Sequence, residues 1–121
     1  MKWLVIFMMN DFFEKILKKV KVGVIILNEQ LEILFWNKNL EKLTQRSSSE
    51  VEGKKLSNVF EIFRKNVYQN FFQDVLISGQ SIFCSGALHD VFIQPAADKK
   101  IKQNMLLAPL EHDHKKYIIL L

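Results

Sequence analysis

Two apolar runs separated by a short polar turn constrain the fold more than any other part of the sequence. The first run spans residues 24–27, directly after Gly23, and the second spans residues 31–36 and ends at Trp36. Both are short, rich in branched and aromatic residues, and joined by the polar triplet at residues 28–30. This pattern predicts two antiparallel strands connected as a tight β-hairpin.

Both faces of the predicted hairpin are apolar. Because side chains alternate between the two faces of a strand, we expect one face to carry Ile25, Leu27, Leu34 and Trp36, and the other to carry Val24, Ile26, Ile33 and Phe35. A strand pair that is apolar on both sides needs cover on both sides. We expect the helices that follow to cover one face, and either an N-terminal helix or a second subunit to cover the other.

The segments on either side of the hairpin carry the signals of helix ends. Asn37 is a suitable N-cap for a first short helix, and Ser47 with Glu50 forms a capping box for a second. Before the hairpin, a capping box at Asp11 starts a helix that ends near Lys21. Apolar residues at three- and four-residue spacings form one face of this N-terminal helix: Phe12, Phe13, Ile16, Leu17 and Val20.

The second half of the chain predicts a long helix and a closing hairpin. Residues 64–78 show helical periodicity that Gly79 terminates, and residues 81–83 form the next strand. Residues 105–110 and 117–121 are expected to pair around a polar turn. Strand alternation and helical spacing together direct one set of side chains to a common interior: Ile25, Leu27, Leu34, Trp36, Leu43, Phe71 and Val75.

Composition limits the classes of protein that fit. A chain of 121 residues with 49% hydrophobic residues suits one domain with one core. The net charge of +4 comes from scattered lysines and not from a basic stripe, so we expect no nucleic-acid partner. The apolar segment at residues 3–9 is far shorter than the ~20 residues that a membrane span needs. We expect a cytoplasmic domain without membrane contact, and the apolar end of the sequence is typical of a domain within a longer protein.

Few residues suggest chemistry. The polar stretch with His112, Asp113 and His114 fits a solvated turn better than a metal site, because no further ligands stand at metal-binding spacing. Cys84, the single cysteine, excludes an internal disulfide, and its apolar neighbours favour a buried thiol over a nucleophile. The pair His89-Asp90 is better explained as a surface contact than as a catalytic base and its orienting acid. We therefore expect no catalytic residue and no metal ligand.

The order of elements and several of the letters resemble the first half of a PAS domain. The resemblance starts with the strand–turn–strand that ends in Trp36-Asn37, continues through the helix with Leu43-Thr44, and includes the stretch SEVEGKKL at residues 49–56. It covers nearly the whole chain from about Asp11. It implies an α+β fold, the PAS fold: a five-stranded antiparallel sheet with helices packed on one face and an N-terminal flanking helix. We divide the chain into a flanking segment and helix, 1–22, and a PAS core, 23–121.

The resemblance also implies a function. PAS domains are sensory and dimerisation modules without catalytic activity of their own, often within sensor histidine kinases or cyclic-dinucleotide (GGDEF) enzymes, in which an output domain follows. The alternative is a sensor that binds a small apolar or polar ligand in its core. By this resemblance the ligand-pocket candidates are Ile25, Leu27, Leu34, Trp36, Leu40, Thr44, Phe71 and Val75.

The residues that cofactors use in related PAS domains are missing at the matching positions. The stretch at residues 44–56 lacks the cysteine of light-sensing flavin domains, and residues 64–78 lack a haem-ligating histidine. We therefore expect no cofactor. We expect a homodimer, because the apolar stripe of the N-terminal helix and the second face of the hairpin exceed what a monomer exposes. The interface candidates are Phe12, Phe13, Ile16, Leu17, Val20, Val24, Ile26 and Phe35.

Overall fold

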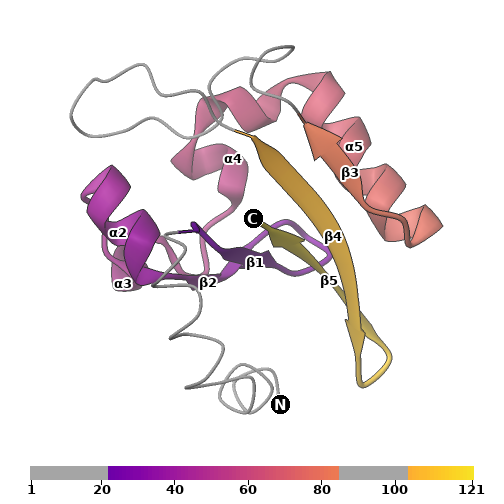
Figure 1. Cartoon of the computed structure of the whole chain (residues 1–121), viewed down its shortest axis with the longest axis horizontal. Helices are drawn as coiled ribbons and strands as arrows, with labels where there is room; N and C mark the ends of the chain where they lie inside the picture. The colour runs from indigo at the N-terminus through magenta and orange to yellow at the C-terminus, as the bar shows by residue number, and fades with distance from the viewer. Residues whose placement is uncertain (1–21, 85–103) are drawn as a thin grey trace.

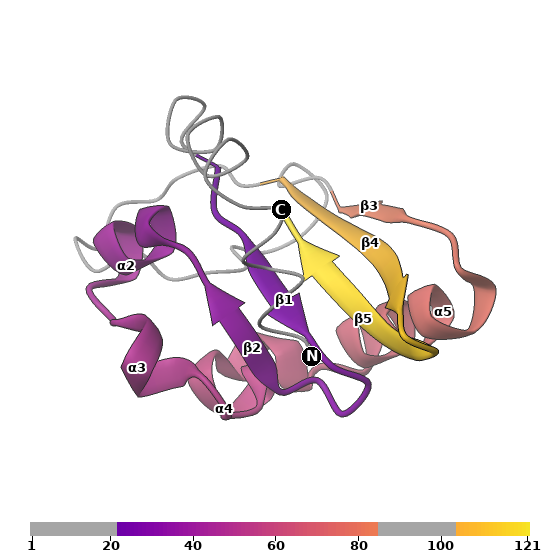
Figure 2. The same cartoon turned by 90° about the horizontal axis from the view of Figure 1, so that it is seen from below.

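An antiparallel β-sheet organises the part of the chain that the structure, a computed structural model, describes: residues 22–84 and 104–121. Its strands are β1 (Ile25–Leu27), β2 (Ile33–Trp36), β3 (Ile82–Cys84), β4 (Met105–His112) and β5 (Lys115–Leu120). They lie in the order β2-β1-β5-β4-β3, which Figure 2 shows edge to edge. The first hairpin and the closing hairpin therefore meet where β1 pairs with β5. The five-stranded antiparallel sheet of the prediction is confirmed, and the predicted N-terminal helix lies outside the described residues.

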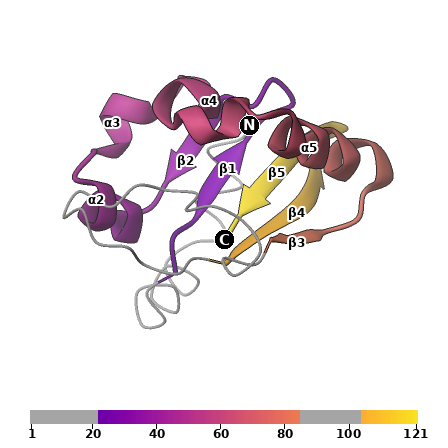
Figure 3. The same cartoon turned by 90° about the horizontal axis from the view of Figure 1, so that it is seen from above.

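Helical segments connect β2 to β3 and pack on one face of the sheet. They are α2 (Lys38–Thr44), α3 (Ser48–Val51), α4 (Leu56–Val59), the 3₁₀ helix η1 (Glu61–Arg64) and α5 (Asn66–Ser78). Figure 1 and Figure 3 show α4 and α5 lying across the strands, with α2 and α3 beyond the β2 edge. We call the face under α4 and α5 the inner face, and the opposite one the outer face.

Local capping signals set the ends of these helices. The Asn37 side chain accepts a hydrogen bond from the backbone N–H of Leu40, which starts α2. Ser47 and Glu50 form the predicted capping box of α3. Gly79, with a φ of 70°, ends α5 in the left-handed conformation that glycine adopts without strain. These helix ends are confirmed. Each depends on neighbours within a few residues, and the sequence could therefore predict it.

The pairing of β1 with β2 differs from simple alternation. Ile26 pairs with Phe35, but Leu27 pairs with Ile33, so Leu34 is an extra residue in a β-bulge. Partners directly opposite each other share a face, which places Ile33 with Leu27 on the inner face. The prediction that Leu34 shares the face of Leu27 is therefore wrong. Leu34 is buried, but it lies outside the core, and Ile33 takes its place.

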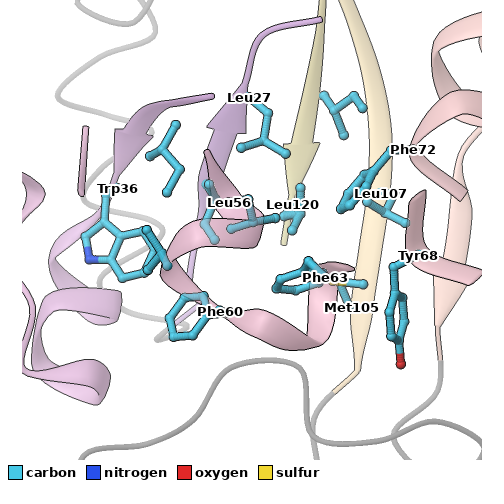
Figure 4. Packing of buried hydrophobic residues seen from close by; sticks show 14 of the residues in the cluster. Leu27, Trp36, Leu56, Phe60, Phe63, Tyr68, Phe72, Met105, Leu107 and Leu120 are labelled. Atoms are coloured by element: carbon cyan, nitrogen blue, oxygen red, sulfur yellow. The ribbon is translucent and has the colours of Figure 1, made fainter. Parts of the chain in front are cut away.

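The core lies between the inner face and the helices, as Figure 4 shows. Helix α5 faces it with Tyr68, Phe72 and Val75, which recur at i, i+4 and i+7. Phe71, predicted to point inward, only packs against its margin, and Leu43 is half-buried and not a member. The core cluster consists of Ile25, Leu27, Ile33, Trp36, Leu40, Val51, Leu56, Val59, Phe60, Phe63, Tyr68, Phe72, Val75, Cys84, Met105, Leu107, Ile118 and Leu120.

The closing hairpin is longer than the sequence predicted. Its ladder continues through the polar pairs Glu111–Lys116 and His112–Lys115, so the turn shrinks from the expected six residues to two. Asp113 and His114 make this turn with φ values of 50° and 62°. Positive φ at both central residues is the mark of the tight hairpin turn whose twist matches that of paired strands. The opposite charges of Glu111 and Lys116, directly across the ladder, favour the first of these two pairs.

Candidate functional site

The interior beneath the helices is the candidate site, because the structure gathers most of the predicted pocket residues there. Five of the eight belong to the core cluster: Ile25, Leu27, Trp36, Leu40 and Val75. Thr44 is buried at the end of α2, and Phe71 packs against the cluster from α5. Leu34 is not among them, because the bulge removes it from the inner face.

An aromatic corner closes the core beside β2. The indole of Trp36 stacks on the ring of Phe60, with 5.8 Å between ring centroids and 15° between planes. The guanidinium of Arg46 lies 5.7 Å from the centroid of the same Phe60 ring, within the range of a cation–π contact. Trp36 Nε1 donates to the carbonyl oxygen of Arg46 at 3.2 Å. The exposed Arg46 therefore covers the rim of an otherwise apolar corner.

A chain of aromatic rings continues from this corner through the core. Phe63 lies 6.4 Å from Phe60, 5.7 Å from Tyr68 and 5.9 Å from Phe72, measured between ring centroids (Figure 4). Sequence reasoning missed Phe60, Phe63 and Tyr68. Phe60 and Phe63 stand at and after the break between α4 and η1, where no single periodicity applies. The i, i+4, i+7 spacing from Tyr68 was the signal that would have found the third.

The described interior holds almost no polar chemistry. Besides the indole N–H of Trp36 and the hydroxyl of Tyr68, its buried polar side-chain group is the hydroxyl of Thr44, which donates to the Leu40 carbonyl at 2.6 Å. Within residues 22–84 and 104–121, every buried side-chain nitrogen and oxygen has a hydrogen-bond partner. A general acid or base needs a polar group aimed at a substrate. The geometry of the described core therefore suits packing or the enclosure of an apolar molecule.

The titratable candidates from the sequence stand apart from one another. Cys84 is fully buried, and burial raises the pKa of its thiol, which disfavours the reactive thiolate. His112 Nε2 lies 3.3 Å from a carboxylate oxygen of Asp113 at the exposed hairpin turn. Within residues 22–84 and 104–121, no three or more His, Cys, Asp or Glu side chains form a group that could hold a metal ion. The residues at 89–90 lie outside the described part.

The outer face of the sheet carries a continuous apolar row. Strand register aligns Phe35 with Ile26, Ile26 with Ile119, and Ile119 with Ala108. Of the interface candidates, Val24 and Ile26 are 3% and 6% exposed and Phe35 is half-buried. Toward the β3 edge the same face exposes Phe83, at 63%. The interface candidates Phe12, Phe13, Ile16, Leu17 and Val20 lie outside the described residues.

No helix within the described residues is long and apolar enough to cross a membrane.

Comparison with known sequences gives one family. The family model described as PAS fold matches residues 11–82, which is more than half of the chain. A search of curated proteins finds no match. The matched range begins before β1 and ends at the start of β3.

Solved structures with the same fold include PAS domains and a sensory box sensor histidine kinase. A sensory box sensor histidine kinase from Vibrio cholerae superposes with a TM-score of 0.69 at 15% identity, covering 90% of this chain and 85% of that one. The PAS domain of nitrogen regulation protein NR(II) from Vibrio parahaemolyticus gives 0.66 at 16% identity, covering 92% and 95%. The PAS domain of the quorum-sensing receptor RpfR from Cronobacter turicensis, in complex with C12:0, gives 0.58 at 17% identity, covering 81% and 87%. At these identities the likeness shows the fold.

Proposed function

The chain belongs to the PAS fold family, and from this premise we propose that it is a non-catalytic sensory and dimerisation module. Its parent is a larger cytoplasmic signalling protein, a sensor histidine kinase or a cyclic-dinucleotide enzyme of the GGDEF type, whose output domain does the chemistry. The division into a flanking segment, 1–22, and a core, 23–121, is part of this proposal. The interior supports it, because the described core packs apolar and aromatic side chains with their polar atoms satisfied.

The observation that carries the dimerisation role is the apolar row across the outer face. An antiparallel sheet normally alternates apolar side chains toward the core with polar ones toward water. Here Ile26, Phe35 and Ile119 occupy the outward positions, and within the single chain Ile26 is 6% exposed while Phe35 and Ile119 are half-buried. A two-fold pairing buries such a face in both chains at once. The apolar stripe predicted for residues 12–20 adds to the same surface in this proposal.

Sedimentation of the whole chain tests the dimer. The wild type is expected to run as a dimer at tens of micromolar, where a binding free energy of about −6 to −7 kcal/mol already pairs it. Phe13→Glu with Ile16→Glu should give a folded monomer, because a carboxylate buried without a partner is strongly destabilising at an interface. The matched control, Asn70→Glu with Gln73→Glu, places the same charge on the exposed side of α5. A wild type that sediments as a monomer at these concentrations rejects the dimer.

The second candidate function is ligand sensing. A structure of the same fold, the RpfR PAS domain, holds C12:0. The core of this chain is apolar, with Arg46 as a cation at its rim. Native mass spectrometry of the purified chain distinguishes the two roles: a bound small molecule supports sensing, and the bare mass supports a packing role. Absorbance of the same sample tests the expectation that neither haem nor flavin is bound, and a visible band that survives gel filtration contradicts it.

A further inference from the structure

The chain enters β1 through a junction that is held on helix α2. The carbonyl oxygen of Val22 accepts two hydrogen bonds, from Asn37 Nδ2 at 2.8 Å and from Asn39 Nδ2 at 3.0 Å. Two residues later, the Val24 N–H donates to Asn37 Oδ1 at 3.1 Å, and the Asn37 N–H donates to the Val24 carbonyl at 3.2 Å. Four hydrogen bonds therefore fix Val22 and Val24, on either side of Gly23, to the start of one helix.

Asn37 also belongs to the helix itself. Its Oδ1, which receives the Val24 N–H, accepts the Leu40 N–H at 3.2 Å as the N-cap of α2. One amide group thus joins the entry to β1, the end of β2 and the first turn of α2. A displacement of α2 changes all these bonds together, because each of them involves Asn37 or Asn39 at the start of the helix.

Packing reinforces the hydrogen bonds. A Cβ placed on Gly23 would lie 2.8 Å from Cδ2 and 3.0 Å from Cγ of Leu40, closer than carbon atoms approach in van der Waals contact. Gly23 is therefore present because its backbone rests directly on this side chain, and no left-handed φ is involved. Leu40 is 3% exposed and belongs to the core cluster. The same leucine touches the interior on one side and the entry strand on the other.

We propose that residues 22–24 form a mechanical junction that passes movements of α2 to the chain preceding Val22, with Asn37 and Asn39 as positioning residues. This regulatory device rests on the proposed function, since the segment before Val22 carries the stripe assigned to dimerisation. A ligand or a change of packing that shifts Leu40 moves Gly23 by contact and Val22 through the two asparagines. Such a shift moves Val22, from which the flanking segment continues.

The test uses the full chain with a nitroxide label at Asn10→Cys, and it measures both label mobility in the native state and the dimer dissociation constant. Gly23→Ala adds the methyl group that Leu40 obstructs, and Asn39→Ala removes one of the donors to Val22. Each is expected to alter the label spectrum and to change the dissociation constant by about tenfold. Adding Leu40→Val to Gly23→Ala removes Cδ2, the closest obstructing atom, and should recover part of both changes. Asn70→Ala, on the exposed side of α5, is the matched control and should change neither.

The outcomes separate transmission from simple support of the fold. A purely structural role lowers the urea midpoint and leaves the label spectrum of the native protein unchanged, and that result in both variants overturns the proposal. Equal changes in Asn70→Ala, or no recovery with Leu40→Val, overturn it too. If Gly23→Ala fails to fold, Asn39→Ala still decides. If the wild type is a monomer, the dimer is rejected but the junction is not, because the comparison of label spectra needs no partner chain.

Discussion

Truncation of Trp36 tests the core that the structure assigns. The indole is 2% exposed, so nearly its whole surface is removed from water. A buried aromatic side chain of this size contributes about 150 to 250 Å², and at about 25 cal/mol per Å² this corresponds to about 4 to 6 kcal/mol. Alanine retains a small part of that surface, and truncations of this kind cost about 3 to 5 kcal/mol. We expect Trp36→Ala to fall in that range.

A second substitution separates the ring from its hydrogen bond. Trp36→Phe keeps an aromatic ring to stack on Phe60 but loses the N–H that donates to the Arg46 carbonyl. Such a bond contributes about 0.5 to 1.5 kcal/mol, so with some lost surface the cost should be about 1 to 2.5 kcal/mol. Urea unfolding followed by circular dichroism measures both variants without depending on tryptophan fluorescence.

The control and the refuting result follow from burial. Phe83→Ala removes an aromatic side chain that is 63% exposed, and its cost should stay within about 0.5 kcal/mol. If Trp36→Ala costs less than about 1 kcal/mol, or no more than Phe83→Ala, then Trp36 is not part of the core. The register of β2 against β1 would fail with it, because Trp36 pairs with the inner-face residue Ile25.

Three further predictions concern single side chains. Burial, with the nearby charge of Glu41 adding to it, raises the pKa of Glu52 in the folded chain. Its ionised form is therefore destabilising, and in urea melts Glu52→Gln should raise the free energy of unfolding at pH 7 by less than about 1 kcal/mol. This gain should shrink as the pH falls through the raised pKa of Glu52 in the folded chain and should be gone below its pKa in the unfolded chain, whereas Glu61→Gln on the exposed surface should show none; a loss at pH 7 contradicts the assignment. The Cys84 thiol, fully buried and with its pKa raised by burial, should react with Ellman's reagent only when the chain unfolds, so rapid reaction of the native protein contradicts its position. Ser47→Ala removes the acceptor of the α3 capping box and should cost about 1 kcal/mol in the same melts, while Ser57→Ala serves as the control and an equal cost in both refutes the cap.

Signals that act over a few residues were predictable from the sequence. The caps at Asn37 and Ser47 and the stop at Gly79 are local, because each side chain or φ value is decided by residues within one helical turn. The family resemblance supplied the strand count and the placement of helices on one face. Together these gave the architecture, and four of the seven residues predicted to point inward belong to the core cluster: Ile25, Leu27, Trp36 and Val75.

Features that depend on distant partners were not predictable. The bulge that turns Leu34 away from the core coincides with pairing of β2 to the loop after α3. There the Gly53 N–H donates to the Ile33 carbonyl at 2.7 Å, and the Ile33 N–H donates to the Lys54 carbonyl at 2.8 Å. These bonds hold Ile33 on the side of β2 that faces away from β1. The alternation of side chains along the strand does not indicate them. The stacking of Phe60 on Trp36 likewise requires knowing how α4 turns into η1. A candidate pocket based on strand parity alone therefore included Leu34 and omitted Phe60.

Strand β1 explains why sensing and assembly are proposed for the same small sheet. It has three residues and pairs on both sides, with β2 and with β5. Ile25 and Leu27 point into the core cluster, while Ile26 between them points to the outer face. A strand this short has no room to bend between its two faces, so a displacement of Leu27 by a change in the core also displaces Ile26. In the proposed function the two surfaces are therefore separated by one peptide unit, and the junction at residues 22–24 stands at the end of the same strand.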